Sequence, residues 1–366
     1  MIKGDNMNWE ESLFLDGKEE IANHFGKLGS LLLILGIGFD PRTCKIAEII
    51  LGINPNVSVW VVDYQDEGLH NNANEESSRR NYQRLVDLCK GSAAFKRLTI
   101  PMYKLDGYKK TLTIYERVKK EFTTEKINIY KNIIVDVSAM PRGVSFSILK
   151  RLLSIRGQDQ RINIAVCENS EYDDAILPVI VEESAEYLPG FNTFSMSLEQ
   201  DESETIWFPV LGMSDTGTLK IIADYIKPIE ICPIIPFPSK DVTRGERILR
   251  SCGETLFREM NVEKRNIIYV PENNPLLVYQ KLFDTVNYYE RALKIVTDRT
   301  TKYAFSSQSS KMIDVGVLLA IIELSQLGYK TGIVIVENQG YTQIGDYCES
   351  KESVYCLCLH DNVFAW

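Results

Sequence analysis

The sequence predicts an α/β protein built from two tandem, duplicated Rossmann-like domains, each with a doubly wound and mainly parallel sheet, related by pseudo-two-fold symmetry. Three observations predict this fold. Short Val- and Ile-rich runs alternate with amphipathic stretches, as in parallel sheets covered on both faces. Glycine-bearing turns join the runs to the stretches, and the second half of the chain repeats the order of the first. The 366 residues, 45% of them hydrophobic, suffice for roughly two to three domains with buried cores.

The repeat consists of three matched pairs of segments. A strand, glycine turn and helix occur twice, a helix with Tyr-Glu-Arg occurs twice, and a strand ending in Glu-Asn occurs twice. The copies are 176, 174 and 169 residues apart, measured from Gly36 to Gly212, from Glu116 to Glu290 and from Glu168 to Glu337. Alternation of strands and helices does not by itself produce such matched motifs, so we expect an internal duplication.

Hydrophobic periodicity gives the elements of each copy. In the first copy, strands are expected at 31–36, 57–63, 132–137 and 162–167, and helices at 41–51, 76–90, 111–121 and 143–155. In the second copy, strands are expected at 206–211, 230–236, 266–270 and 332–337, and helices at 216–226, 243–259, 275–296 and 312–327.

The domain organisation follows from these elements and from one acidic, turn-rich stretch, LEQDESE, which is typical of a linker. The expected parts are an N-terminal helical arm at 1–28, a first Rossmann-like domain at 29–197, a linker at 198–204, a second Rossmann-like domain at 205–345 and a closing strand or cap at 346–366.

Composition excludes several functional classes. The formal charge of −9 argues against an extended nucleic-acid surface. No apolar run approaches the roughly 20 residues that span a bilayer, and the N-terminus lacks a secretory signal, so we expect a cytoplasmic protein without a membrane partner. Eight scattered cysteines without a CxxC pair, together with only three histidines, predict no metal site.

The first candidate site is the turn Gly36-Ile-Gly38-Phe-Asp40-Pro-Arg42, which joins a strand to a helix. It contains GxG without the third glycine of the dinucleotide fingerprint. Asp40 before a proline is typical of an N-cap, and Arg42 in the first helical turn predicts a bound phosphate or a side chain that leans into solvent. Asp63 ends the next strand, near the position where nucleotide folds place an acid on a ribose hydroxyl; an ordinary strand-end acid is the alternative.

The second candidate site follows a strand in each copy. In the first copy, Asp136 ends a strand and is expected as a catalytic acid, with Ser138 as a second catalytic residue that offers a hydroxyl and Arg142 as an anion-binding cation at a helix start. The second copy places small hydroxyl residues and a lysine at the matching distance, and these predict an anion nest or, alternatively, a polar turn with an N-cap: Ser307, Ser310 and Lys311.

Other polar residues are given mainly structural roles. Glu168-Asn169 with Tyr172 is expected to cap its loop, with hydrogen bonds to a ligand as the alternative. Arg244 lies on a row of arginines at helical spacing that is typical of a solvated surface, and Glu272 is expected as a free carboxylate near the rim.

These residues predict binding of a phosphorylated nucleoside or similar anion at the strand-end loops, with Arg42, Arg142 and Lys311 neutralising it. A carboxylate with flanking cations would suit cleavage or transfer at a glycosidic or phosphate bond, but the sequence does not decide whether the protein is an enzyme, nor which cofactor it takes.

Two alternatives stay open. The segment LGIGFDPR resembles the glycine-rich turn of carboxyl methyltransferases, which implies a fold that holds S-adenosylmethionine; the resemblance covers about eight residues and that family lacks a duplicated half. The lack of a catalytic triad favours a non-catalytic sensor or an assembly subunit with a protein partner or a second copy. The turn DVSAMPR also resembles loops of uncharacterised prokaryotic proteins from anti-phage gene clusters, which implies a defence complex.

Overall fold

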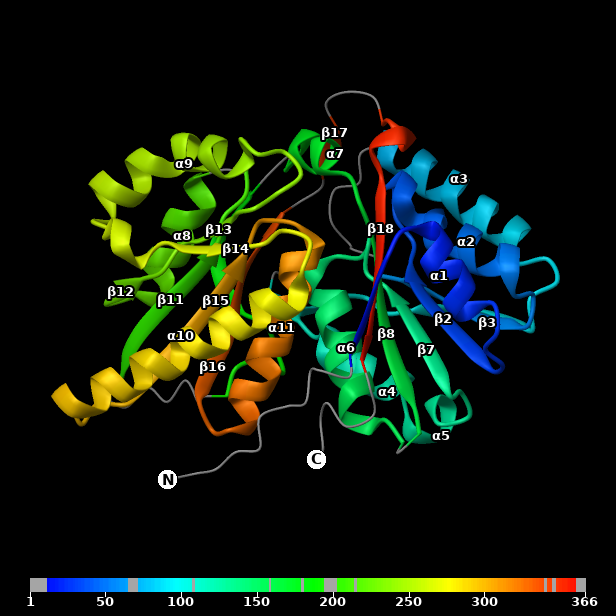
Figure 1. Ribbon diagram of the computed structural model, residues 1–366, viewed down its shortest axis with the longest axis horizontal. Helices are drawn as coiled ribbons and strands as arrows, with labels where there is room; N and C mark the ends of the chain where they lie inside the picture. The colour runs from blue at the N-terminus through cyan, green and yellow to red at the C-terminus, as the bar shows by residue number, and fades with distance from the viewer. Residues whose placement is uncertain are drawn as a thin grey trace. The chain divides into compact units, whose positions relative to one another are not determined.

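The computed structural model describes residues 12–64, 72–106, 109–157, 159–178, 181–193, 203–213, 216–338, 341–343 and 347–359 (Figure 1). The chain forms two compact units. Unit 1 comprises Met1–Tyr172 together with Gly345–Trp366, and unit 2 comprises Asp173–Ile344.

Unit 1 is built on a seven-stranded sheet in the order β1-β18-β8-β7-β2-β3-β4. Its central strands are buried along their whole length, which is typical of parallel strands covered on both faces. The five parallel strands take the 3-2-1-4-5 order of a Rossmann-type sheet, and β18 joins β8 and β1 antiparallel. The strands are β1 (Leu13–Asp16), β2 (Leu31–Gly36), β3 (Val57–Asp63), β4 (Ala94–Thr99), β7 (Asn132–Asp136), β8 (Arg161–Glu168) and β18 (Ser353–Leu359).

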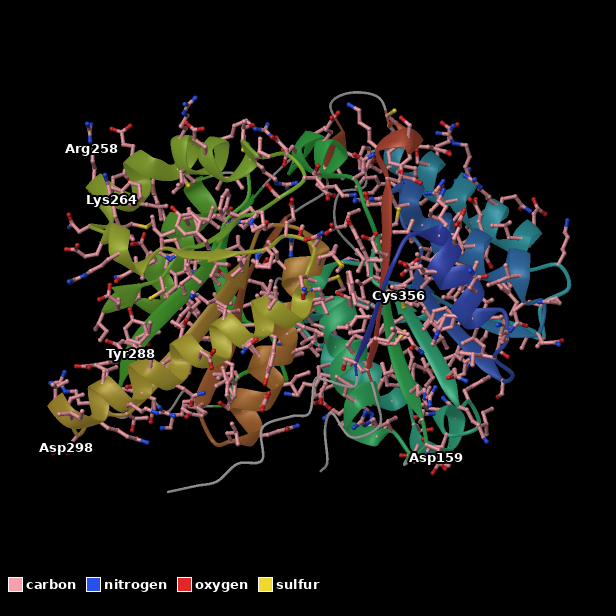
Figure 2. All side chains as sticks on the ribbon, in the orientation of Figure 1. Asp159, Arg258, Lys264, Tyr288, Asp298 and Cys356 are labelled. Atoms are coloured by element: carbon pink, nitrogen blue, oxygen red, sulfur yellow. The ribbon has the colours of Figure 1, made fainter. Side chains whose placement is uncertain are left out.

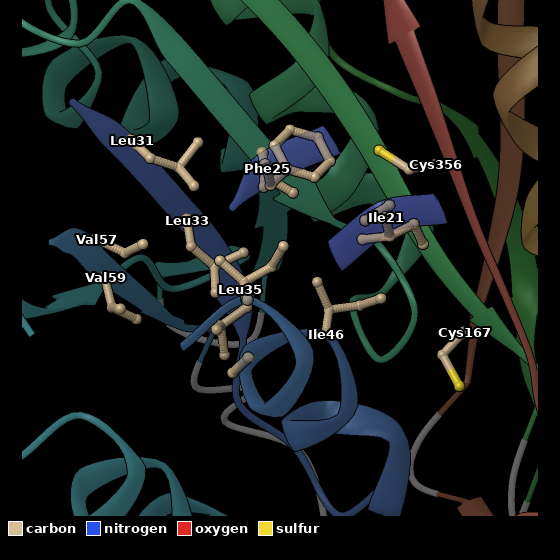
Figure 3. Close-up of a cluster of buried hydrophobic side chains, with 14 of the residues drawn as sticks. Ile21, Phe25, Leu31, Leu33, Leu35, Ile46, Val57, Val59, Cys167 and Cys356 are labelled. Atoms are coloured by element: carbon tan, nitrogen blue, oxygen red, sulfur yellow. The ribbon is translucent and has the colours of Figure 1, made fainter. Parts of the chain in front are cut away.

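Helices cover both faces of this sheet (Figure 1). The helices of unit 1 are α1 (Lys18–Phe25), α2 (Lys45–Ile53), α3 (Asn72–Leu88), α4 (Ile114–Glu121), α5 (Thr124–Ile127), α6 (Arg142–Ile155) and the start of α7 (Ser170–Ala175). A 3₁₀ turn, η2 (Pro41–Cys44), leads into α2, another, η5 (Glu349–Lys351), precedes β18, and β5 (Tyr103–Asp106) pairs with β6 (Lys109–Leu112). Figure 3 shows one buried cluster of the core, to which Phe25 of α1, Ile46 of α2 and Leu33 of β2 all contribute.

Unit 2 contains a second mainly parallel sheet, in the order β10-β16-β15-β11-β13-β14. Its five parallel strands again follow the order 3-2-1-4-5, and β10 pairs with β16 antiparallel. The strands are β10 (Val181–Tyr187), β11 (Glu204–Val210), β12 (Glu230–Ile231), β13 (Ile234–Pro236), β14 (Ile268–Val270), β15 (Thr301–Ser307) and β16 (Lys330–Asn338), with a separate pair β9 (Ile176–Pro178) and β17 (Tyr341–Gln343).

The helices of unit 2 are α8 (Thr216–Ile226), α9 (Arg244–Glu254), α10 (Pro275–Val296) and α11 (Lys311–Gln326). A π-helical turn, η3 (Thr255–Glu259), extends α9, and η4 (Lys264–Asn266) precedes β14. Charged side chains such as Arg258, Lys264 and Asp298 lie at the periphery of unit 2 (Figure 2). None of the helices in the described part of the chain is both long and apolar enough to cross a membrane.

Each sheet contains an antiparallel strand, β10 or β18, that follows the parallel strands of the other unit in the sequence. After the five parallel strands of unit 1, the chain supplies β10 to the sheet of unit 2. After the five parallel strands of unit 2, it supplies β18 to the sheet of unit 1. The observed units therefore differ from the expected domains 29–197 and 205–345: unit 2 begins at Asp173, and most of the expected linker lies outside the described residues.

Candidate functional site

The candidate site of unit 1 lies at the carboxyl edge of its sheet. In open α/β sheets ligands bind at this edge, where the strand order reverses. Here the reversal falls between β2 and β7, which are direct neighbours. The sequence-predicted residues Gly36 to Arg42 follow β2, Asp63 ends β3, and Asp136 to Arg142 follow β7, so the fold brings these three predicted segments to one edge.

The two glycines of the first turn are closely covered by other side chains. A Cβ atom on Gly36 would lie 2.5 Å from Cγ of Met140 and 3.2 Å from Cε1 of Tyr64. A Cβ atom on Gly38 would overlap the hydroxyl of Tyr64. Both positions therefore need glycine in the observed conformation, because a larger residue would push Tyr64 or Met140 away.

Asp40 and Arg42 form a buried ion pair in this turn. Nη2 of Arg42 lies 2.6 Å from Oδ2 of Asp40, and the guanidinium carbon of Arg42 lies 5.2 Å from the ring centre of Tyr172. Arg42 is only 3% exposed. Its charge is matched within the protein by Asp40, and the predicted solvent-facing arrangement of Arg42 is wrong because the side chain folds back under Tyr172.

The backbone donors at the start of η2 are used within the turn. Pro41 has no N–H, the N–H of Arg42 donates to Oδ1 of Asp40 at 2.9 Å, and the N–H of Thr43 donates to the carbonyl of Asp40 at 3.1 Å. Asp40 is thus the N-cap, as one of its predicted roles required. Its carboxylate takes the position at which a helix start would otherwise receive a phosphate.

Asp63 is buried and paired with an arginine of the edge strand β4. Nε of Arg97 donates to Oδ2 of Asp63 at 3.0 Å, and Nη2 donates to the same oxygen. Arg97 in turn lies over the ring of Tyr82, 4.8 Å from its centre. The carboxylate has the strand-end position expected of a ribose ligand, and it carries an internal partner that a ribose would share or displace.

Asp136 ends β7 and is 2% exposed. Its Oδ1 accepts hydrogen bonds from the backbone N–H of Ser138 at 3.0 Å and from the Ser138 hydroxyl at 2.5 Å. The same hydroxyl accepts the N–H of Cys167 at 2.7 Å, so Ser138 joins the ends of β7 and β8. Burial raises the pKa of Asp136 to about 7, and Asp40 nearby adds to the rise while Arg42 opposes it.

The loop after β7 also contacts the loop after β3. The Tyr64 hydroxyl donates to the carbonyl of Ala139 at 3.2 Å. Arg142 is half-buried and begins α6, with Pro141 at the N-cap. Nδ2 of Asn81 donates to the carbonyls of Gly38 and Asp40, at 2.8 and 3.0 Å, which fixes the first turn from α3.

In the loop after β8, Asn169 makes the hydrogen bonds expected of a capping residue. Oδ1 of Asn169 accepts the N–H of Tyr172 at 3.2 Å, and its Nδ2 donates to the carbonyl of Cys348 at 3.1 Å. Next to this loop, Nζ of Lys45 lies 2.9 Å from Oε2 of Glu352, which ties the start of α2 to the residue before β18.

The predicted site residues of unit 2 form a helix cap. Ser307 ends β15 and its hydroxyl donates to Oδ1 of Asp314, a buried residue in the first turn of α11. Oγ of Ser310 is the N-cap and accepts the N–H of Ile313 at 3.4 Å. Lys311 is the half-buried first residue of α11. The three predicted residues thus lie together, with a carboxylate that the sequence analysis did not include.

A second charged cluster in unit 2 corrects two sequence-based expectations. Arg244 is 2% exposed rather than solvated, with Nη1 lying 3.0 Å from Oε1 of Glu272 and Nη2 lying 3.2 Å from Oδ1 of Asp174. Glu272 is therefore a buried partner and not a free carboxylate. The reason is that α9 begins close against the end of β13, where a Cβ atom on Gly245 would lie 2.9 Å from the carbonyl oxygen of Pro236.

Tyr64, Asn81 and Arg97 are the site residues that sequence reasoning missed. Tyr64 directly follows the strand-end Asp63, and this position next to a predicted site residue is the sequence feature that could have identified it. Arg97 lies in β4, whose sequence AFKRLT lacks the apolar pattern of a buried strand because β4 is the sheet edge. The described residues hold no group of three or more His, Cys, Asp or Glu side chains arranged for a metal ion.

No protein-family model matches the sequence, and no curated protein matches it. Solved structures with partial similarity include an rRNA methylase from Streptococcus thermophilus, 14% identical with a TM-score of 0.23, where the match covers 40% of this chain and 68% of the other. An O-methyltransferase from neocarzinostatin biosynthesis, solved with S-adenosylhomocysteine, is 10% identical with a TM-score of 0.21, covering 40% of this chain and 38% of the other.

A Haemonchus contortus phosphoethanolamine N-methyltransferase, solved with S-adenosylhomocysteine, is 10% identical with a TM-score of 0.24, and the match covers 93% of this chain and 51% of the other. This chain thus spans less than two thirds of the second and third of these proteins. All three are methyltransferases of low identity to this chain. The strand order of the chain itself is that of a Rossmann-like fold.

Proposed function

We propose that unit 1 binds a nucleoside ligand of the S-adenosylmethionine type at the turn after β2, and that the protein is an S-adenosylmethionine-dependent methyltransferase. The observation that carries the proposal is the pairing of two strand ends. The glycine turn Gly36–Gly38 follows β2, and the acid Asp63 ends β3, its direct neighbour in the sheet. A turn that admits a close ligand beside a ribose-binding acid is the arrangement nucleoside-binding sheets use.

The contacts of Asp40 favour a ligand without phosphate. Asp40 already accepts the N–H of Arg42 at the start of η2, and its carboxylate would repel a pyrophosphate placed there. The ligand S-adenosylmethionine carries no phosphate and has a positive sulfonium. The sequence-based expectation of a phosphorylated nucleoside receives less support for this reason.

The residues present fit such a ligand at two points. Gly36 and Gly38 would let the ligand approach the backbone once the side chains of Tyr64 and Met140 have moved off them, and Asp63 would accept the ribose hydroxyls once it shares or releases Arg97. When bound, the ligand would supply an electrophilic methyl group to a nucleophilic atom of the substrate.

Asp136 is the group of this chain suited to hold or move a proton during that reaction. Its pKa of about 7 lies near neutral pH, and a general acid or base is most effective where its pKa is close to the pH of the reaction. Both hydrogen bonds from Ser138 go to Oδ1 of Asp136. Because Ser138 donates to Oδ1, we assign Ser138 as the residue that positions the carboxyl group and the other oxygen, Oδ2, as the proton-accepting atom.

Titration calorimetry with S-adenosylhomocysteine tests the proposal. We expect the Asp63→Asn variant to bind at least tenfold more weakly than the wild type, because an amide offers one acceptor oxygen instead of two. Asp87→Asn, which changes an exposed acid on α3 of the same unit, is the matched control and should bind like the wild type. Equal affinity of Asp63→Asn and wild type would contradict the assignment of Asp63.

A non-catalytic sensor or assembly subunit is the second candidate. The observation that favours it is that side chains of the protein itself cover the ligand positions, Tyr64 over Gly38 and Arg97 on Asp63. Binding of S-adenosylhomocysteine without methyl transfer to any offered acceptor would support a sensor.

We further propose that the two halves arose by duplication. The shared 3-2-1-4-5 strand order and the matched motifs of the sequence support this, and so does the position of Asp136 and Ser307 at the ends of corresponding strands, β7 and β15.

A further inference from the structure

We propose that Tyr64 is an internal gate: its ring occupies the nucleoside-binding face of the turn after β2, and the ligand binds only when this ring leaves. The inference rests on the proposed function and concerns the regulation of the same site. It assigns a role to a residue that sits directly after Asp63 and that the chemistry of methyl transfer does not use.

The contacts at the two glycines carry the proposal. The Tyr64 hydroxyl lies where a Cβ atom of Gly38 would be, and Cε1 of its ring lies 3.2 Å from the corresponding position on Gly36. Glycines at these positions normally give a ligand access to the backbone. Here the access is taken by a half-buried aromatic ring of the same chain.

The backbone before Tyr64 is fixed, while its side chain is bound to the next loop by a neutral contact. The neighbouring Asp63 is held by the β3–β4 ladder, because its carbonyl accepts the N–H of Ile100 at 2.8 Å, and by its ion pair with Arg97. The hydrogen bond from Tyr64 to the carbonyl of Ala139, at 3.2 Å, is between neutral groups and is worth about a factor of ten or less in an equilibrium. Rotation of the side chain would uncover Gly38, and Met140, whose Cγ lies 2.5 Å from the Cβ position of Gly36, would also have to move before a ligand could reach Gly36.

Movement of the Tyr64 ring would also affect the loop after β7, which holds the second candidate site. The side chains of Tyr64 and Met140 both lie close to the Cβ position of Gly36. Tyr64 also donates a hydrogen bond to the carbonyl of Ala139, the residue after Ser138. Departure of the ring releases the carbonyl of Ala139, the residue before Met140. Ligand entry at the first turn is thereby linked to the loop that positions Asp136.

The test is calorimetric titration of S-adenosylhomocysteine into the wild type and into the Tyr64→Ala and Tyr64→Phe variants. We expect Tyr64→Ala to bind at least tenfold more tightly than the wild type. Tyr64→Phe should lie between the two, since it keeps the ring but loses both the bond to Ala139 and the oxygen over Gly38. Tyr115→Ala removes another half-buried tyrosine of unit 1 and should leave the affinity unchanged.

The outcomes separate the gate from the proposed function. If Tyr64→Ala and Tyr64→Phe bind as tightly as the wild type or more weakly, Tyr64 is not a gate, while the binding itself still supports the proposed function. If no variant binds at millimolar ligand, the proposed function fails and the gate fails with it. Should Tyr64→Ala not fold, the comparison of Tyr64→Phe with the wild type decides in the same way.

Discussion

At the scale of single residues, Asp136 makes stability depend on pH. Its pKa is raised to about 7 in the folded protein, whereas an exposed aspartate has a pKa near 4. Between these values the folded state binds one more proton than the unfolded state, so raising the pH from about 4 to 7 lowers the free energy of unfolding by about 1.4 kcal/mol per pH unit. The Asp136→Asn variant lacks this ionisation.

Urea unfolding of wild type and Asp136→Asn across this pH range measures the effect. The difference in unfolding free energy should shift steadily in favour of the Asp136→Asn variant as the pH rises. A difference that stays constant from pH 4 to 7 would show that Asp136 titrates normally.

The effects of replacing Arg42 and Asp40 on stability depend on each other, because the two residues form a buried ion pair. Arg42→Met leaves the Asp40 carboxylate without its cation and should cost about 3 to 5 kcal/mol of unfolding free energy. Adding Asp40→Asn removes the charge while keeping a capping oxygen, so the double variant should regain most of that loss. Chemical denaturation of the single and double variants checks this. Equal destabilisation of the two variants would contradict the claim that the unpaired charge of Asp40 causes the loss of stability.

The residues of the candidate site could be located from the sequence, but their partners could not. Strand ends predicted the positions of Asp63 and Asp136, because side chains at the carboxyl ends of parallel strands meet at one edge. The pairing of Asp63 with Arg97 depends on which strand lies next to β3, and the covering of Gly38 depends on a side-chain conformation of Tyr64. Neither is encoded in local spacing.

At the scale of elements, the packing of α10 on α11 depends on Gly316. A Cβ atom there would lie 2.5 Å from both the carbonyl oxygen of Pro275 and Cβ of Val278. Gly316→Ala should therefore destabilise the protein by about 1 to 3 kcal/mol through overpacking.

Gly52→Ala is the matched control. Gly52 also lies inside a helix, α2, but nothing approaches its Cβ position within 4 Å. This substitution should be neutral or stabilise by up to about 1 kcal/mol, because alanine favours helix. Thermal melts of both variants measure the contrast, and similar melting temperatures would refute the close approach of the two helices.

Elements with strong apolar patterns were predicted well, and the others were missed for a common reason. β2 and β3 agree with the prediction because fully buried strands are apolar throughout. The edge strand β4 and the central strand β15 were not predicted, since β4 is partly exposed and β15, TKYAFSS, carries polar residues at both ends. Burial of β15 comes from its neighbours β11 and β16, which local composition does not show.

At the scale of the whole molecule, β18 makes unit 1 depend on a distant part of the chain, because all of unit 2 lies between β18 and the other strands of unit 1 in the sequence. β18 is buried almost throughout and pairs with residues 162–168 of β8. A chain that ends at Lys351 would leave β8 with an unpaired edge and remove Cys356 and its neighbours from the core of unit 1.

Hydrogen exchange of that truncated chain gives a clear readout. We expect amides of β2, β7 and β8 to lose protection while those of β11 and β15 keep more of theirs, because β18 belongs only to the sheet of unit 1. Loss of protection confined to unit 2 would contradict the observed pairing. The pairing of β18 with β8 could not be predicted from the sequence, since a closing strand could be expected at the C-terminus but its partner strand could not.

The most direct test of the central claim is hydrogen exchange of the wild-type protein with and without saturating S-adenosylhomocysteine. We expect added protection in segments of unit 1 at 36–44 and 137–144, with the peptides of unit 2 at 306–314 unchanged. Protection confined to unit 2, or no change anywhere at millimolar ligand, would contradict the claim that the carboxyl edge of the first sheet is a nucleoside site.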